Sequence, residues 1–351
     1  MPVLIFLILF LVSSPIARAE PYLSVMAEAQ CSHCHVNPTG AGMRSDHGVG
    51  LYTQYTLEKT RSFLDSDFKA RVSKYLALGA DVRLRHLSTI ESPTSNSFTV
   101  PQGSLYVRSD PISKFSIMTD TDLANLVSRE FFGLVHDLPA NLWIKFGRMN
   151  VPYGLRIADD TSFIRNDLGF GYANQDIGLE VGLEPEPLTI AVAVTNGVPG
   201  GNADDNNNKA VTSSVSWLWD KVSAGGSFQW NDRLTTQTLT GGGHVGLHLW
   251  HLAFLGEFDA QKVNDKTTGI ERTVLAGYGE MDYRIIRGLY LKGVYDVIDD
   301  RLAASGLHHR AGVGFDFFPI PFLQVSILYR LRVGNGALDN DQIGVAFHGF
   351  F

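Results

Sequence analysis

From about Tyr75 to its last residue, the chain repeats one pattern: segments of roughly ten residues in which apolar and polar side chains alternate, each followed by a break. Residues 323–331, for example, read LQVSILYRL. Successive side chains of a strand point to opposite faces, so such a segment predicts a strand with one apolar face and one mainly polar face. Residues 342–351 follow the same rule and end on the aromatic Phe351.

The breaks between these segments are alternately short and long. Short breaks fall at residues 110–112, 137–140, 185–187, 219–221, 250–251 and 319–321. Longer and more polar breaks span residues 88–97, 149–175, 196–208, 231–238, 262–269, 299–306 and 334–341. Membrane barrels have tight turns at one end and longer loops at the other, so residues 75–351 are predicted to form an all-β, up-and-down transmembrane barrel of about 16 antiparallel strands. A secreted protein of several packed sheets is the competing interpretation.

Composition agrees with a barrel in outer-membrane lipid. Charged residues make up 19% of the chain, below the roughly 25% of soluble domains. A formal net charge of −7 argues against nucleic acid as a partner. Aromatic residues close to the short breaks suit the girdle that such barrels place at the lipid–water interface. The residues expected in this girdle are Trp143, Trp217, Trp219, Trp250, Phe318 and Phe322.

The N-terminus indicates export. Residues 4–12 read LIFLILFLV, and Ala17-Arg18-Ala19 forms a small-residue cleavage pattern before Glu20. The apolar run is much shorter than the roughly 20 residues of a spanning helix. Residues 1–19 are therefore predicted to be a cleaved signal peptide, and a retained anchor is the alternative.

The only two cysteines of the chain stand in one pentapeptide, CSHCH, at residues 31–35. In an exported chain, C-x-x-C-H is the attachment pattern of c-type haem. Cys31 and Cys34 would form the two thioethers, and His35 would be the proximal ligand of the haem iron. A zinc site would need further ligands, a thioredoxin-like motif would need a βαβ setting, and a local disulfide does not require the histidine. Residues 20–74 are therefore expected to form a small N-terminal module that holds one covalent haem c.

The distal ligand of such a haem stays open. His47 and Met43 lie in the same module and are the two named candidates, and Met26 and His86 lie nearby in the sequence. A methionine would raise the reduction potential relative to a second histidine. The run Pro38-Thr39-Gly40-Ala41-Gly42 lets the backbone approach a porphyrin closely, although it also reads as a plain loop.

One break, residues 149–175, is longer than a hairpin needs, and loops of this length are usually functional or disordered. Asp159 and Asp160 in it suit a hard iron ion, but charges in a barrel loop more often form a pore constriction. In a transport porin, arginines that face the lumen would select anions. Arg83, Arg85 and Arg108 are the residues named for this role.

A signal peptide, one haem motif and one barrel together resemble the fused monohaem cytochrome–porins of the bacterial outer membrane. The stretch CSHCHVNPTGAGMR also resembles the haem-binding start of porin-like cytochromes of metal-respiring bacteria. The resemblance implies a haem module on the periplasmic side or inside the barrel. It also implies electron transfer between an extracellular donor or acceptor such as iron and a periplasmic c-type cytochrome or other carrier.

The sequence leaves the direction of electron flow open, and with it whether the protein is an iron-oxidising or a metal-reducing cytochrome. Two alternatives remain. One is an outer-membrane transport porin in which the haem is structural or sensory, and the other is a soluble periplasmic haem protein built from β-sandwiches.

Overall fold

The computed structural model describes residues 21–52, 55–57, 70–90, 96–201, 203–300, 306–333 and 341–351. The predicted signal peptide, residues 1–19, lies outside the described residues, and so do residues 20, 53–54 and 58–69 of the predicted N-terminal module. Within the described part of the chain, no helix is long and apolar enough to cross a membrane.

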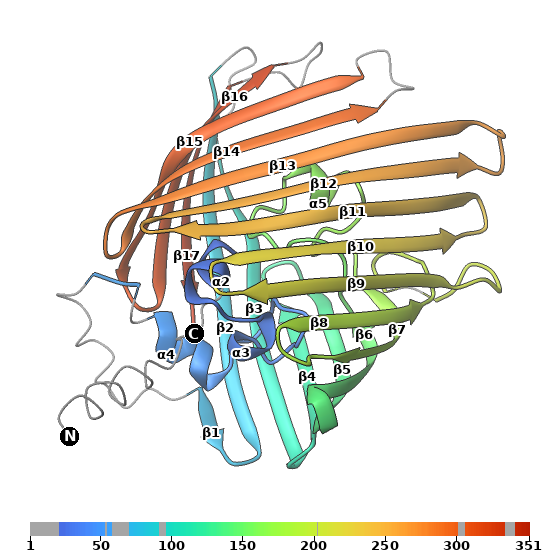
Figure 1. The fold of residues 1–351 in the computed structure, drawn as a ribbon, viewed down its shortest axis with the longest axis horizontal. Helices are drawn as coiled ribbons and strands as arrows, with labels where there is room; N and C mark the ends of the chain where they lie inside the picture. Colours follow the sequence, from blue (N-terminus) through green and yellow to red (C-terminus); the bar gives the residue numbers. More distant parts are fainter. Residues whose placement is uncertain are drawn as a thin grey trace, which may run out of the picture.

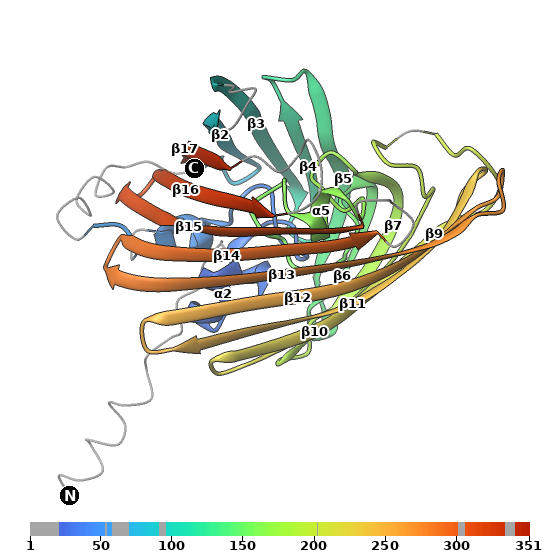
Figure 2. The ribbon, with the colours of Figure 1, turned by 90° about the horizontal axis from the view of Figure 1, so that it is seen from above.

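Sixteen antiparallel strands, β2 to β17, form a closed barrel, as the sequence predicts. Each strand pairs with the next, and β17 closes the ring on β2, where Ala346 stands opposite Arg85 (Figures 1 and 2). The short strand β1, Arg71–Ser73, pairs with the start of β2. The barrel strands are β2 (Leu76–Thr89), β3 (Asn96–Ile112), β4 (Phe115–Asp122), β5 (Val127–Leu138), β6 (Leu142–Met149), β7 (Asp176–Leu183), β8 (Leu188–Thr195), β9 (Ala210–Trp219), β10 (Val222–Asp232), β11 (Thr236–Leu249), β12 (Leu252–Asp265), β13 (Glu271–Ile286), β14 (Leu289–Asp300), β15 (Leu307–Ile320), β16 (Leu323–Val333) and β17 (Gln342–Phe350).

The connections alternate between a short-turn end and a long-loop end of the barrel, but two connections at the long-loop end are tight turns. Residues 233–235 join β10 to β11, where a longer break at residues 231–238 is predicted. The connection between β4 and β5 lies at the long-loop end but spans only residues 123–126. Asp122 makes this tight turn possible, because its Oδ1 atom accepts hydrogen bonds from the backbone N–H groups of Ala124 and Asn125 at 3.0 and 3.2 Å. At the short-turn end, the 3-10 helix η2, Pro139–Asn141, joins β5 to β6.

Apolar side chains of the strands face outward, and polar side chains face the lumen. Val313 and Phe315 of β15 are exposed, whereas Asp316 of the same strand is fully buried. The girdle prediction holds for Trp219 and Trp250, which are 62% and 91% exposed at the short-turn end.

The girdle prediction is wrong for Trp143 and Phe318, which are buried. Both occupy positions whose side chains point into the barrel in the alternation of their strands. The indole N–H of Trp143 donates to Glu180 Oε1 at 2.9 Å, and Phe318 packs edge-on against Tyr290.

The described N-terminal segment, residues 21–52, packs against the inner wall of the barrel (Figure 1). It contains three short helices, α2 (Pro21–Ala27), α3 (Cys31–Cys34) and α4 (Asp46–Tyr52). Tyr22 and Leu23 of α2 belong to one apolar cluster with Leu255 of β12 and Tyr290 of β14. A Cβ atom on Gly246 of β11 would lie 2.6 Å from Val25 Cγ2, so the missing side chain makes room for α2.

The predicted long break between β6 and β7 is an ordered loop that folds into the lumen and carries the helix α5, Phe163–Asn166 (Figure 1). Its Tyr153 and Phe170 rings stack at 3.8 Å, and both belong to an apolar cluster with Tyr278 of β13. We call residues 150–175 the lumen loop.

Candidate functional site

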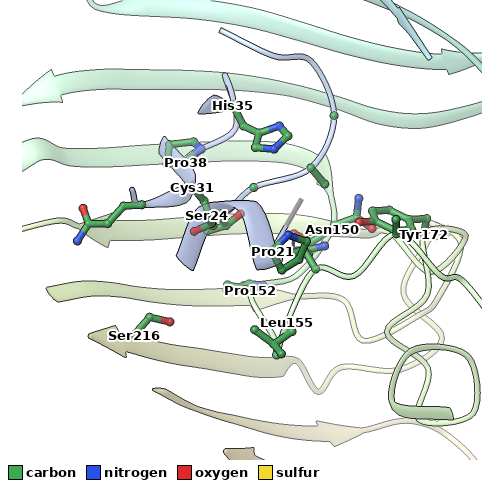
Figure 3. Close-up of a pocket in the computed structure, with 18 of the residues that line it drawn as sticks. Pro21, Ser24, Cys31, His35, Pro38, Asn150, Pro152, Leu155, Tyr172 and Ser216 are labelled. Atoms are coloured by element: carbon green, nitrogen blue, oxygen red, sulfur yellow. Dashed lines mark hydrogen bonds between the residues drawn. The ribbon is translucent and has the colours of Figure 1, made fainter. Parts of the chain in front are cut away.

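A pocket of about 200 Å³ inside the barrel lies between the N-terminal segment, the lumen loop and the barrel wall. We call it the motif pocket, because Cys31 and His35 line it. Figure 3 shows Cys31, His35 and Pro38 of the N-terminal segment at this pocket, together with Pro152 and Leu155 of the lumen loop. The barrel wall contributes mainly polar and charged side chains, so the pocket is wetter than a buried apolar core.

The CSHCH pentapeptide forms one helical turn followed by an extended residue. His35 ends α3 with φ −115° and ψ 148°, and its backbone N–H donates to the Cys31 carbonyl at 3.0 Å. Cys31 is exposed to the pocket, but Cys34 is fully buried in the apolar cluster around α2. That cluster includes Val25 and Leu255, two residues that also line the pocket.

Residues 35–44 form a small hairpin. His35 and Arg44 make an isolated antiparallel bridge, and the Val36 N–H donates to the Met43 carbonyl at 3.0 Å. The run Pro38–Gly42 is its turn, and it lines the motif pocket. Gly40 has φ +85°, which favours glycine, and a Cβ there would lie 3.3 Å from Cys31 Sγ.

The hairpin separates the candidate distal ligands from His35. Side chains on its two strands alternate, so His35 and Arg44 face the motif pocket while Met43 is buried against the wall of β2 to β6. His47 is exposed on α4 and does not line the pocket. Met26 is buried in the cluster around α2.

His86 does not line the pocket either, since the neighbouring positions Arg83, Arg85 and Leu87 are the ones that face the lumen. The structure instead brings two other histidines to the motif pocket, His244 of β11 and His348 of β17. The sequence could have indicated both histidines, because each occupies a position whose side chain points inward in the apolar–polar alternation of its strand. Both ring nitrogens of His348 already have partners, Asp81 Oδ2 at 2.9 Å and Gln324 Oε1 at 3.1 Å.

Polar contacts hold the motif segment on the wall at the short-turn side of the pocket. The Ser32 hydroxyl donates to Glu184 Oε1 at 2.6 Å, from α3 to the turn between β7 and β8. Enclosure within the barrel, followed by the nearby Glu184 carboxylate, raises the pKa of the Cys31 thiol to about 11. Without haem, the thiol is therefore protonated at neutral pH.

A second pocket of about 260 Å³, which we call the outer pocket, lies between the lumen loop and the wall of β2, β13, β14, β16 and β17. Pro21, Arg83, Ala158 and His348 line both pockets, so the two pockets meet there. The Arg83 guanidinium donates to the Ala158 carbonyl at 3.1 Å at this junction. The lumen loop thus lies between two adjoining pockets of the barrel interior.

Ion pairs and hydrogen bonds hold the lumen loop in place. Asp159 pairs with Arg330 of β16, and the Tyr153 hydroxyl donates to Asp259 Oδ1 at 2.8 Å. Burial by itself would raise the pKa of Asp159, but Arg330 and the hydrogen bonds from Thr161 outweigh it and hold the pKa below the usual range. Within the described residues, no three His, Cys, Asp or Glu side chains gather to hold a metal ion. Asp159 instead ties the lumen loop to the barrel wall through Arg330.

The motif residues fit a covalent haem in part. Cys31, His35 and the Pro38–Gly42 turn present a thiol, an imidazole and a close backbone approach to one pocket. Cys34 lies three residues from Cys31 on the same turn, so their side chains project to one side of α3. In this structure, however, Cys34 is enclosed by the apolar cluster, so a second thioether requires a local shift of α3 or α2.

No protein-family model matches the chain, and no curated protein matches it either. Solved outer-membrane barrels share its fold. A loop-deletion variant of OmpT from Vibrio cholerae superposes with a TM-score of 0.63 at 8% identity, covering 79% of this chain and 99% of that one. An anion-selective porin from Comamonas acidovorans gives 0.58 at 10% identity, covering 79% and 99%. The channel DcaP of Acinetobacter baumannii gives 0.56 at 10% identity, covering 81% and 99%. Identities this low establish a porin-like fold and leave function to the site.

Proposed function

We propose that this chain is a bacterial outer-membrane channel that passes small polar solutes through its barrel. The observation that carries the proposal is the pair of adjoining pockets inside a closed barrel, lined on the wall side mainly by polar and charged side chains, while the outer wall is apolar. Exposed apolar side chains on the outer wall suit lipid, and a polar lumen suits solutes. The porin-like neighbours support the same function.

The N-terminal segment and the lumen loop narrow the path, so the expected conductance is well below that of a barrel with an open lumen. The narrowest point in this proposal is the junction of the two pockets at Arg83 and Ala158.

Single-channel recording in planar bilayers tests the proposal. The purified chain should give discrete conductance steps, and Ala158→Trp should reduce them by filling the junction of the two pockets. Ala311→Trp is the matched control, because Ala311 is exposed on the outer face of β15. A folded barrel, identified by heat-modifiable gel migration, that conducts nothing would overturn the proposal. Equal conductance of the two variants would show that solutes do not pass Ala158.

One specific observation favours a second candidate function: Cys31 and His35 line the same pocket of the lumen. In this proposal one haem c is attached to Cys31 and Cys34, with His35 as the proximal ligand of its iron. Bound haem would supply one-electron chemistry inside an otherwise insulating barrel. Electrons would pass between an extracellular donor or acceptor such as iron and a periplasmic cytochrome, with the N-terminal segment inside the barrel or at its periplasmic mouth. The distal ligand and the direction of flow stay open.

Mass and colour test the haem directly. Chain produced with a c-type haem maturation system should carry the added mass of one haem and show a Soret band, and Cys31→Ala/Cys34→Ala should lose both. Sealed proteoliposomes then test electron transfer between an impermeant donor and a trapped acceptor. His35→Ala should slow this transfer strongly. A colourless chain with the bare peptide mass would remove this candidate and leave the channel untouched.

A further inference from the structure

We infer that Arg85 of β2 forms a binding site for the oxyanion group of small solutes, a carboxylate or a phosphate, in the outer pocket. The inference rests on the proposed channel function and specifies the class of solute. It depends on which arginines of the inner wall form ion pairs with carboxylates and which do not.

Several arginines of the lumen are neutralised by a carboxylate. Arg83 pairs with Asp81 at 3.1 Å, and Arg108 pairs with Asp110 at 2.7 Å. Arg330 pairs with Asp159. Arginines paired in this way have little capacity left for a mobile anion, because their charge and their best donors are already engaged.

Arg85 differs from these residues. Among the residues that the structure describes, no carboxylate pairs with Arg85. Its Nε atom is buried without a hydrogen-bond partner, as is that of Arg330, but Arg330 has Asp159 as its counter-charge. The side chain lines the outer pocket and is only partly exposed. A guanidinium without a counter-charge in a partly enclosed site is costly, so the site gains free energy when an oxyanion supplies that charge. A guanidinium also presents paired N–H donors that match carboxylate and phosphate oxygens.

The wall beside Arg85 leaves room for such a solute. Ala346 of β17 stands opposite Arg85 in the strand register, and Gly344 also lines the pocket. These small residues do not cover the guanidinium. Arg83 lies two positions away on the same face of β2, toward the junction of the pockets, so an anion released from Arg85 next meets a second, partly neutralised cation.

Reversal potentials in bilayers under a KCl gradient provide the first test. Arg85→Gln should lower the ratio of anion to cation permeability about fivefold, the effect of one contact between unit charges in water. Arg108→Gln is the matched control, because Arg108 lines neither pocket and its partner Asp110 keeps a second ion pair with Arg71 at 3.0 Å. The control should change the ratio little.

Block of the potassium chloride current provides the second test and distinguishes the sources of the oxyanion. Succinate and phosphate are added separately, and each that binds at Arg85 should reduce the current in the parent and in Arg108→Gln but not in Arg85→Gln. Block by one anion alone assigns the site to that class.

An unchanged permeability ratio and equal block in Arg85→Gln and the parent would overturn the inference while leaving the channel in place. A parent chain that does not conduct would instead overturn the proposed function.

Discussion

Lys145 of β6 donates to Asn37 Oδ1 at 3.0 Å and so joins the barrel wall to the hairpin that follows the CSHCH motif. Lys145 is fully buried, and its ammonium also pairs with Glu180 at 2.8 Å and donates to Thr39 at 3.2 Å. A buried ammonium with a carboxylate and two further acceptors is well compensated. The hairpin thus supplies two hydrogen-bond acceptors to the Lys145 ammonium, in addition to the Glu180 carboxylate of the wall.

Asn37→Ala should loosen this hairpin without unfolding the barrel. A hydrogen bond to a charged group contributes about 1.5–3 kcal/mol, and Lys145 keeps Glu180 as its partner. Hydrogen exchange of residues 35–44 should rise, while exchange in β6 stays slow. Asn206→Ala, in a loop between β8 and β9, is the control. Unchanged exchange in Asn37→Ala would show that Lys145 does not hold the hairpin.

Alkylation of Cys31 should depend steeply on pH in chain made without haem. Because the pKa of the thiol is raised to about 11, the thiolate is scarce at pH 8. The rate with iodoacetamide, followed by mass spectrometry in Cys34→Ser, should rise about tenfold per pH unit up to pH 10. Glu184→Gln should speed the reaction at pH 8, since Glu184 is the second cause of the shift. A rate that levels off near pH 9 in the folded chain would contradict this prediction.

Asp159→Asn should raise the single-channel conductance by releasing the lumen loop from Arg330. The folded pKa of Asp159 lies below its ordinary value of 3.8, so the ion pair stabilises the loop at every pH above about 4 and is lost only in stronger acid. This ion pair should therefore cause no change in the conductance of the parent between pH 5 and 8. The conductance of Asp159→Asn should be higher than that of the parent over the same range. Equal conductance of the two chains would mean that other contacts suffice to hold the loop.

Gly246→Ala should displace α2, because the new Cβ would lie 2.6 Å from Val25 Cγ2; it would also lie 2.4 Å from Ser223 Oγ of β10. The expected readout is faster hydrogen exchange in residues 21–27 with little change in β11. Gly279→Ala is the matched control, since a Cβ at Gly279 of β13 would meet nothing within 4 Å. If α2 exchanges equally in both variants, the close approach at Gly246 is not what holds it.

Much of the barrel could be predicted because its signal is local. The alternation of Val313, Phe315 and Asp316 along one strand indicates which side chains face lipid and which face the lumen. The turn between β4 and β5 was missed, because no break was predicted between residues 112 and 137, and Asp122 closes this turn by local hydrogen bonds to the backbone. Trp143 was assigned to the aromatic girdle because it is a tryptophan, although its position in the alternation of β6 points inward. Its buried partner Glu180 comes from the neighbouring strand β7.

The candidate site depended far more on contacts between distant segments. CSHCH identified Cys31 and His35 as neighbours, and their shared pocket agrees with that local spacing. That Met43 faces away from His35 follows from the hairpin bridge between His35 and Arg44, which the residue order does not reveal. The same holds for the arginines, because whether Arg83 or Arg85 is neutralised depends on which carboxylates the folded wall and loop bring near.

The amino-acid order alone determined the sheet, the number of strands, their inward and outward faces and the position of the CSHCH motif, because alternation and short spacings act between neighbours in the chain. Tertiary structure decided what fills the barrel and which charges in it are neutralised. Lys145 and Asn37 are 108 positions apart, and Asp159 and Arg330 are 171 apart. Such pairs form only when barrel closure brings remote residues into one enclosed space. There, a buried charge without a partner costs free energy, so each partner matters for stability.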